Sequence, residues 1–206
     1  MPEEQAIQFD ERGLVPCVAQ DWTTGEVLTL AYMSVESLAL TRETGEVHFW
    51  SRSREEIWRK GETSGNVLRL RQLRYDCDAD AIVALVEPSG PACHTGARSC
   101  FHRTLNHDGE PVPAAHEALA VLERTLADRQ RERPDDSYTV ELLDDPERIG
   151  AKVREEADEV AQAATGESDE RVAEEAADVV YHLAVLLRSR DVPFARVLDT
   201  LNDRRR

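Results

Sequence analysis

Residues 76–100 read DCDADAIVALVEPSGPACHTGARSC, and the chain is organised around these residues. It contains three of the four cysteines of the chain, together with three aspartates and a histidine. Thiolates are soft ligands that select zinc, whereas carboxylate oxygens suit magnesium, calcium or manganese. The apolar run 81–86, which we expect to be a strand, separates the two ligand-bearing segments. The sequence therefore predicts two different metal sites in this part of the chain.

The aspartates Asp76, Asp78 and Asp80 occupy every second position. Side chains alternate across an extended chain. If residues 76–80 are extended, the three carboxylates share one face and Cys77 points to the other, so that one short strand serves two sites. The alternative is that these closely spaced aspartates lie in a solvated turn.

The cysteines Cys77, Cys93 and Cys100 offer three ligands to a zinc ion and leave its fourth position open, as in a catalytic site. A water in that position is acidified towards neutral pH and becomes a nucleophile. His94, adjacent to a ligand, is placed to move its proton. Free cysteines usually behave as buried apolar residues, however, and the gap from Cys77 to Cys93 fits no standard finger spacing. Cys17, inside an apolar run, is expected to be a packed core thiol.

Composition and charge limit the class of protein. The 206 residues suffice for one large or two small domains. Residues 1–103 carry 11 Lys and Arg against 16 Asp and Glu, and residues 104–206 carry 14 against 25, so neither half resembles a nucleic-acid binder. No apolar run approaches the ~20 residues that span a bilayer, and the acidic start at residues 1–4 lacks a signal-peptide layout. We expect a cytoplasmic protein, whose reduced cysteines favour metals over disulfides.

The amino-terminal half is expected to be mainly antiparallel sheet. Ser34 caps a short helix over 35–43 that ends at 44–45, and residues 23–26 form a hairpin turn. The expected strands, rich in β-branched and aromatic residues, are 14–21, 27–33, 47–50, 67–75 and 81–86.

Segment 51–66 has the composition of an anion-binding site. Arginine can bind phosphate through a forked pair of hydrogen bonds, and hydroxyls with backbone N–H groups in a tight turn form an anion nest. The alternative is a solvated loop, because no standard phosphate-loop pattern is present. The candidate phosphate ligands are Arg52, Arg54, Lys60, Thr63 and Ser64.

The segments WSRSR (50–54), KGETSGN (60–66), DCDAD (76–80) and CHTGARSCF (93–101) together resemble the signature of phosphoribosyl-AMP cyclohydrolase, which opens the adenine ring in histidine biosynthesis. The resemblance implies a homodimer in which zinc is shared between subunits, with magnesium nearby and the basic segment on the ribose phosphates. His94 would act as general base or proton shuttle. The implied ligands are Cys77, Cys93 and Cys100 for zinc, with Cys77 supplied by the other subunit, and Asp76, Asp78 and Asp80 for magnesium.

The carboxyl-terminal half is expected to be helical. Residues 104–115 are polar with one glycine and two prolines, and we interpret them as the linker between a domain over 1–106 and a domain over 115–206. Leucines at positions 119, 122 and 126 recur at helical spacing until residues 133–134 end the helix. Residues 137–140 are expected to be a loop or a short extended piece.

An internal echo follows, because KVREEADEV (152–160) returns nineteen residues later as RVAEEAADV (171–179). Each copy carries an acidic pair three positions apart, and such residues are neighbours on a helix. Gly166 ends the first helix and Ser168 caps the second, so folding back at Gly166 sets the two pairs level to within ~1.5 Å. Crowded carboxylates repel, and divalent cations compensate them. The alternative is a solvated acidic face. The four carboxylates are Glu156, Glu159, Glu175 and Asp178.

These acidic helices, with residues 137–139 and Lys152 in support, resemble phosphoribosyl-ATP pyrophosphohydrolase, an all-α, MazG-like nucleotide pyrophosphatase. The resemblance implies magnesium on Glu156, Glu159, Glu175 and Asp178, attack of water within the triphosphate, and Lys152 at a phosphate. Tyr181 and His182 on the second helix are expected to serve packing.

The prediction is therefore an α+β protein, with a dimeric, cyclohydrolase-like β domain followed by a MazG-like helical domain. It is a bifunctional hydrolase of histidine biosynthesis that uses zinc and magnesium, acts on phosphoribosyl-ATP and phosphoribosyl-AMP, and binds neither nucleic acid nor membrane. One alternative is a general nucleotide pyrophosphohydrolase with a zinc-stabilised accessory domain. Another is a zinc-dependent dimerisation module joined to a helical interaction domain.

Overall fold

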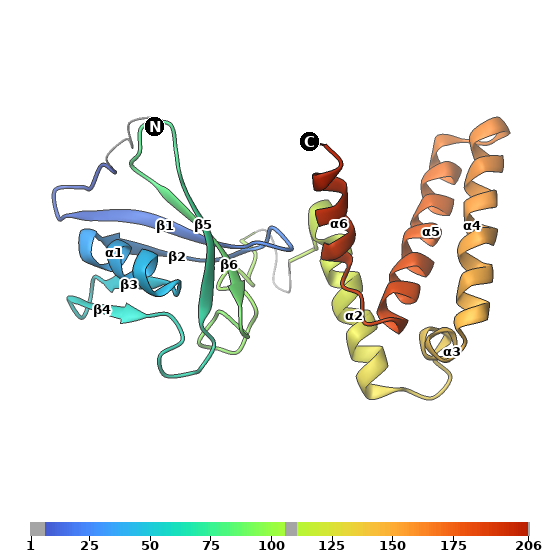
Figure 1. Ribbon diagram of the computed structural model, residues 1–206, viewed down its shortest axis with the longest axis horizontal. Coiled ribbons are helices and arrows are strands. Elements are labelled where there is room, and N and C mark those ends of the chain that lie inside the picture. Colours follow the sequence, from blue (N-terminus) through green and yellow to red (C-terminus); the bar gives the residue numbers. More distant parts are fainter. Residues whose placement is uncertain (1–6, 106–110, 206) are drawn as a thin grey trace. The chain divides into compact units, whose positions relative to one another are not determined.

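The computed structural model describes residues 7–105 and 111–205 (Figure 1). The chain divides into two compact units, Met1–Glu117 and Ala118–Arg206. The predicted fold class is confirmed, because the strands all precede residue 89 and the second unit is helical. Of the predicted linker 104–115, residues 106–110 lie outside the described residues, as do the acidic residues 1–4. No helix in the described part is long and apolar enough to cross a membrane.

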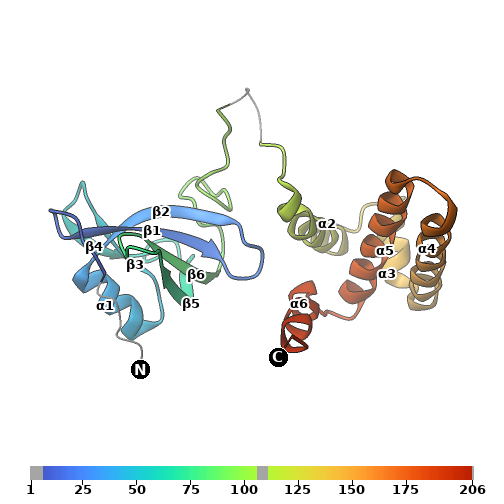
Figure 2. The same cartoon turned by 90° about the horizontal axis from the view of Figure 1, so that it is seen from above.

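The first unit is built on one curled sheet of six strands in the order β4-β3-β2-β1-β6-β5 (Figures 1 and 2). Only β1 and β6 run parallel, so the expectation of a mainly antiparallel sheet is confirmed. Helix α1 lies against β2 and β3. The elements are β1 (Leu14–Asp21), β2 (Val27–Ser34), α1 (Val35–Thr44), β3 (His48–Ser51), β4 (Glu56–Arg59), β5 (Leu68–Tyr75) and β6 (Ile82–Pro88).

Helix α1 begins and ends where the sequence places its caps. The Ser34 hydroxyl accepts a hydrogen bond from the Ser37 N–H, and the Ser37 hydroxyl accepts one from the Ser34 N–H. Gly45 ends the helix in the left-handed conformation, at φ 69°, which glycine adopts without strain. Cys17 is fully buried in the core of the sheet, as expected for a packed thiol. Burial raises the pKa of this thiol to about 12.

Strand β4 lies within segment 51–66, for which the sequence predicts an anion-binding site or a solvated loop and no strand. The strand has only four residues, with Ile57 and Trp58 between a charged residue at each end. This pattern is too short to identify a strand from the sequence alone. The strand exists because it pairs with β3, where Trp58 packs on Phe49 with ring centroids 5.4 Å apart. Tertiary packing rather than local pattern therefore forms this edge strand.

Residues 76–80 form a turn between β5 and β6 and are not extended, so the prediction of alternating faces is wrong. The Asp76 carboxylate accepts hydrogen bonds from the N–H groups of Asp80 (3.0 Å) and Ala81 (3.2 Å), and Ala79 adopts φ 64°. Aspartate favours such turns because its side chain competes for local backbone N–H groups. The solvated turn that was the alternative is what forms.

The described part of the second unit contains five helices, and the 3₁₀ turn η1 (Ala115–Glu117) directly precedes it. Helices α4 and α5 form the predicted hairpin, with the Ser168 hydroxyl accepting from the Arg171 N–H at 3.3 Å. The helices are α2 (Ala118–Glu132), α3 (Tyr138–Asp144), α4 (Pro146–Gly166), α5 (Asp169–Ser189) and α6 (Phe194–Asp203).

Helix α3 replaces the loop or extended piece expected over residues 137–140. Its seven residues give too little periodicity for recognition, and Ser137 makes no side-chain cap. Leu142 is fully buried in the helical core beside Leu126 and Ile149. Burial of this leucine stabilises a helix that the local sequence does not predict.

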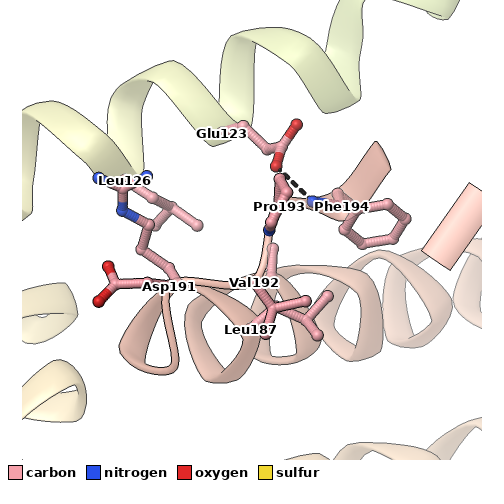
Figure 3. A pocket seen from close by; sticks show the side chains of 9 residues that line it. Glu123, Leu126, Leu187, Asp191, Val192, Pro193 and Phe194 are labelled. Atoms are coloured by element: carbon pink, nitrogen blue, oxygen red, sulfur yellow. Dashed lines mark hydrogen bonds between the residues drawn. The ribbon is translucent and has the colours of Figure 1, made fainter. Parts of the chain in front are cut away.

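Helix α6 starts where the Phe194 N–H donates to the Glu123 carboxylate of α2 at 2.7 Å (Figure 3). A cavity of about 120 Å³ lies between α2, the end of α5 and this helix start, and Leu187, Val192 and Phe194 are among its lining residues. It is remote from the acidic cluster, because Leu187 lies nine residues, or ~13 Å, further along α5 than Asp178. This cavity is therefore not the carboxylate site.

Candidate metal centres

The loop after β6 brings the thiols of Cys93 and Cys100 together. It closes on itself, since the Cys93 N–H donates to the Ala97 carbonyl at 3.0 Å and the Gly96 N–H to the Cys93 carbonyl at 3.1 Å. Gly96 adopts φ 87°, a conformation that other residues enter only with strain. The tight turn explains why a glycine separates the two cysteines.

The two thiols differ in acidity. The Thr95 hydroxyl donates to the Cys93 sulfur at 3.1 Å and lowers the pKa of that thiol. Partial desolvation raises the pKa of Cys100, although a hydrogen bond with Thr29 opposes this. The positive charge of Lys60 favours the thiolate form of both residues, although the pKa of Cys100 remains raised. Cys93 therefore loses its proton first, and the pair offers the soft, ionisable donors that zinc takes.

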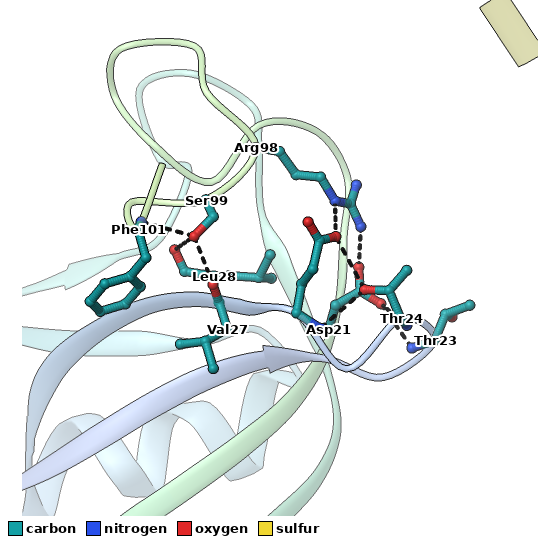
Figure 4. Close-up of polar contacts among 9 residues, drawn as sticks. Asp21, Thr23, Thr24, Val27, Leu28, Arg98, Ser99 and Phe101 are labelled. Atoms are coloured by element: carbon teal, nitrogen blue, oxygen red, sulfur yellow. Dashed lines mark hydrogen bonds and ion pairs between the residues drawn. The ribbon is translucent and has the colours of Figure 1, made fainter. Parts of the chain in front are cut away.

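An ion-pair network fixes the cysteine loop to the turn between β1 and β2 (Figure 4). The Arg98 guanidinium donates to Asp21 and to Glu26, each at 2.5 Å. Asp21 also accepts from the N–H groups of Thr23 and Thr24, at 2.8 and 3.0 Å. The Asp21 side chain is only 5% exposed, so Arg98 compensates a buried charge.

Hydrogen bonds to β2 fix the end of the same loop (Figure 4). The Ser99 hydroxyl donates to the Val27 carbonyl at 2.7 Å and accepts from the Phe101 N–H at 2.9 Å. The Cys100 N–H donates to the Leu28 carbonyl at 2.8 Å. The backbone of Cys100 is thereby held against the sheet while its side chain remains exposed.

Cys77 precedes β6, whereas Cys93 and Cys100 follow it, so the three cysteines flank opposite ends of this strand. The seven residues of β6 extend over ~20 Å, so the Cys77 thiol of the same chain does not reach the Cys93–Cys100 pair. Cys77 is exposed on its turn, with its sulfur 3.9 Å from a carboxylate oxygen of Asp78. One chain thus brings together two of the three predicted zinc ligands.

The turn that carries Cys77 gathers the three predicted aspartates. Each of Asp76, Asp78 and Asp80 is exposed and offers a carboxylate oxygen within 4.8 Å of the others. The charges of Asp78 and Asp76 raise the pKa of Asp80. Desolvation raises the pKa of Asp76, but hydrogen bonds from Ala81 and Asp80 outweigh it and the pKa is lowered. Three oxygens at this spacing fit a hard divalent cation.

His94 is exposed beside the sulfur pair, with its Nδ1 atom 3.9 Å from the Cys93 sulfur. An exposed imidazole next to a metal ligand can exchange protons with a bound substrate and with solvent. This is the position that a proton shuttle requires.

The predicted phosphate ligands of the basic segment lie in two different surroundings. The Arg52 guanidinium stacks on the Tyr32 ring, 4.0 Å from its centroid, and Arg54 pairs with Glu56 at 3.0 Å. Both arginines line one open hollow of about 450 Å³ together with Trp50. A second group surrounds a turn closed at Gly61, where a Cβ atom would lie 2.4 Å from the Asn66 backbone. That group comprises Lys60, whose positive charge acts on the pKa of the cysteine thiols, and the exposed residues Thr63 and Ser64.

In the helical unit, Glu156 of α4 and Glu175 and Asp178 of α5 offer oxygens within 4.8 Å of one another. Glu156 and Glu175 are 6% and 3% exposed, which is rare for glutamate. Desolvation raises the pKa of Glu175, and the charges of Glu159 and Asp178 add to the rise while Arg171 opposes it. Three of the four predicted carboxylates thus offer oxygens within 4.8 Å of one another, while Glu159 is not in that group and acts on the pKa of Glu175.

Two cations of the protein lie against the buried carboxylates. Arg171 pairs with Glu175, and Lys152 contacts Glu156 at 3.3 Å and Glu155 at 3.0 Å. The hydrogen bond with Glu155 is the main reason why the pKa of Lys152 is raised. The carboxylates outnumber these cations, and an all-oxygen donor set of this kind fits a divalent cation such as magnesium.

His182, which was expected to serve packing, is buried and also contacts the edge of the acidic cluster, a contact that was not predicted. Its Nδ1 atom lies 3.6 Å from the Glu156 carboxylate and 2.9 Å from the Asp178 carbonyl. The signal that reveals it is spacing, because His182 follows Asp178 by four positions and Glu175 by seven, on one face of α5.

Comparison with known proteins matches both units separately and together. The family model of phosphoribosyl-AMP cyclohydrolase matches residues 29–102, and that of phosphoribosyl-ATP pyrophosphohydrolase matches residues 119–205. The histidine biosynthesis bifunctional protein HisIE of Bacillus subtilis is 48% identical over 99% of this chain and 97% of its own length. The HisIE protein of Halalkalibacterium halodurans is 46% identical, over 97% and 96%. That of a Synechocystis species is 44% identical, over 97% and 93%.

Proposed function

This chain belongs to the family of bifunctional HisIE proteins of histidine biosynthesis, and we propose how its two metal centres divide the two reactions. The protein is a metal-dependent hydrolase with phosphoribosyl-AMP cyclohydrolase and phosphoribosyl-ATP pyrophosphohydrolase activities. Its substrates are nucleotides. We assign pyrophosphate release to the carboxylates of the α4–α5 hairpin and opening of the adenine ring to the sulfur site.

The helical unit would hold magnesium through Glu156, Glu159, Glu175 and Asp178. Bound magnesium neutralises phosphate charge and polarises water, which is the chemistry that hydrolysis of a triphosphate needs. The observation that carries this assignment is the burial of Glu156 and Glu175 within reach of Asp178. Water attacks within the triphosphate, pyrophosphate leaves, and phosphoribosyl-AMP remains. Lys152, whose ammonium lies at the rim of the cluster, would bind a phosphate oxygen.

The sheet unit would hold zinc through Cys93, Cys100 and Cys77 of the partner subunit in a homodimer. The length of β6 supports sharing, because the three sulfurs of a single chain cannot meet. Bound zinc acidifies water near neutral pH. The turn of Cys77 also carries Asp76, Asp78 and Asp80, so a partner that supplies this sulfur also brings the carboxylates proposed for magnesium.

Ring opening adds water to the electron-poor ring carbon beside the ribosylated nitrogen, and the bond from this carbon to that nitrogen breaks. His94, exposed at Cys93, would take the proton of the attacking water and return it to the leaving nitrogen. Arg52 and Arg54, in one hollow, would bind a ribose phosphate, and Thr63 and Ser64 would contact a second. Both reactions are expected in the cytoplasm, where reduced thiols remain available to the metal.

The test supplies phosphoribosyl-ATP to the full-length protein and follows pyrophosphate and the ring-opened product separately. Glu156→Gln is expected to abolish both signals, because the cyclohydrolase then receives no substrate. Cys93→Ser is expected to leave pyrophosphate release intact while the ring stays closed. Glu174→Gln, an exposed neighbour of Glu175 outside the carboxylate group, is the control and should retain both signals. If Glu156→Gln or Cys93→Ser leaves both products unchanged, the division of labour is refuted.

A further inference from the structure

We propose that Tyr138 and His182 are positioning residues of the pyrophosphohydrolase site. The Tyr138 hydroxyl holds the His182 ring, and that ring fixes the Glu156 carboxylate and the Asp178 backbone in the arrangement that binds the cation. The inference rests on the proposed function, in which Glu156 and Asp178 are cation ligands. It adds helix α3, which carries Tyr138, to the parts of the fold that determine metal affinity.

The contacts of His182 form a chain from α3 to α4. Its Nε2 atom lies 3.3 Å from the Tyr138 hydroxyl of α3. Its Nδ1 atom lies 2.9 Å from the Asp178 carbonyl and 3.6 Å from a carboxylate oxygen of Glu156 on α4. His182 is 5% exposed, and its ring meets the Tyr138 ring edge-on at an interplanar angle of 89°. One imidazole therefore links three helices at the acidic cluster.

The acceptors decide which nitrogen of His182 carries the proton. A carbonyl oxygen can only accept, so the short contact with Asp178 requires a proton on Nδ1. In the neutral ring Nε2 then has a free lone pair, and the Tyr138 hydroxyl donates to it. The Tyr138 hydroxyl thus donates to the imidazole, and the imidazole donates to the Asp178 carbonyl, with the Glu156 carboxylate beside the Nδ1–H. Hydrogen bonds of this kind behind metal ligands orient them and set metal affinity.

Tyr138 is itself fixed in place. The Arg148 guanidinium of α4 lies 5.5 Å from the centroid of its ring, and Leu142, four residues further along α3, is fully buried. The Arg148 cation contacts one face of the Tyr138 ring, and the helix that carries Tyr138 is anchored in the core by Leu142. These two contacts hold the hydroxyl in place beside His182.

A second hydroxyl contact between the same two helices supplies a matched control. The Tyr181 hydroxyl of α5 lies 2.8 Å from the Thr139 hydroxyl of α3, one position away from Tyr138 and His182 in each helix. This pair also joins α3 to α5, but it ends on Thr139 rather than at a carboxylate. Removing either tyrosine hydroxyl costs one α3–α5 hydrogen bond, and only one of the two reaches the proposed cation ligands.

The experiment measures Mn²⁺ binding by electron paramagnetic resonance in the full-length protein with Asp76, Asp78 and Asp80 changed to Asn, which removes the other carboxylate group. We expect Tyr138→Phe to weaken Mn²⁺ binding roughly tenfold, at the lower end of the range for groups behind metal ligands, and Tyr181→Phe to leave it within about twofold. Pyrophosphate release by Tyr138→Phe should recover at saturating metal. His182→Gln, which keeps a donor and an acceptor, should bind Mn²⁺ more tightly than His182→Leu.

The outcomes separate this inference from the proposed function. If Mn²⁺ binds the parent protein and is lost in Glu175→Gln, but Tyr138→Phe binds as the parent does, the positioning role is overturned and the metal site stands. Equal weakening by Tyr138→Phe and Tyr181→Phe would reduce the contact to general packing and also overturn the role. If Glu175→Gln binds Mn²⁺ as tightly as the parent, the carboxylate site itself fails, and the inference falls with it.

Discussion

Arg98→Met removes the guanidinium that compensates two carboxylates while keeping most of the aliphatic side chain. Breaking a buried ion pair by removing one partner costs about 3–5 kcal/mol, because the other charge is left desolvated. Two features reduce the cost here. The Arg98 side chain is 36% exposed, so water screens the site, and Asp21 keeps its hydrogen bonds from Thr23 and Thr24. We therefore expect a loss of about 2 kcal/mol in the free energy of unfolding of the sheet unit.

The assay is urea unfolding of the full-length protein after zinc has been added to fill the proposed sulfur site, together with the rate at which a chelator removes that zinc. Because Arg98 lies between the two cysteines, its loss should also loosen the sulfur pair and speed zinc removal. Arg71→Met is the control, since its 2.5 Å pair with Glu87 is exposed at both ends and is worth at most about 1 kcal/mol. The double variant with Asp21→Asn should lose less than the sum of the single losses.

The result that would refute this reasoning is an Arg98→Met protein that unfolds at the same urea concentration as Arg71→Met and releases zinc at the parent rate. In that case the cysteine loop would be fixed by its backbone hydrogen bonds to β2 alone.

Three further predictions concern the helical unit. Ser168→Ala, which deletes the hydroxyl cap of α5, should cost about 1 kcal/mol in urea unfolding, whereas Ser137→Ala, which deletes no cap bond, should cost less than about 0.5 kcal/mol; equal losses would contradict the capping role. The raised pKa of Glu175 stabilises the folded unit below the pKa of an unfolded glutamate, and this contribution is lost as pH rises through the folded pKa. Mg²⁺ must displace that proton, so the Mg²⁺-dependent rise in Tm should shrink as pH falls through this pKa, and a rise independent of pH would count against the site. Leu142→Ala should lower the free energy of unfolding by about 3 kcal/mol. It should also raise the Mg²⁺ concentration needed for pyrophosphate release, because α3 carries Tyr138. A loss of stability with an unchanged Mg²⁺ requirement would show that α3 has no role in metal binding.

Local signals in the sequence were sufficient for the elements that carry the carboxylate site. Ser168 as a cap, Gly166 as a stop and an acidic pair in each copy of the echo predicted the α4–α5 hairpin, and the structure confirms it. The approach of Glu156 to Glu175 followed from helix rise alone, because both helices extend from one turn and the two residues lie at similar distances from it.

Features that depend on distant contacts were not predictable in the same way. Helix α3 exists through the burial of Leu142, and β4 through its pairing with β3, so neither leaves a sufficient local pattern. Arg98 pairs with Asp21, which lies 77 positions away in the sequence, and no local pattern near Arg98 predicts that partner. The turn at residues 76–80 is a different case, since two local tendencies competed and the hydrogen bonds of Asp76 decided for the turn.

The most direct test of the account returns metals one at a time to chelator-stripped, full-length protein supplied with phosphoribosyl-ATP. Magnesium alone should restore pyrophosphate release while the adenine ring stays closed, and zinc added with magnesium should restore ring opening as well. Full turnover of both reactions by folded protein shown to be free of metal would contradict the claim that bound cations at two separate centres prepare water for attack.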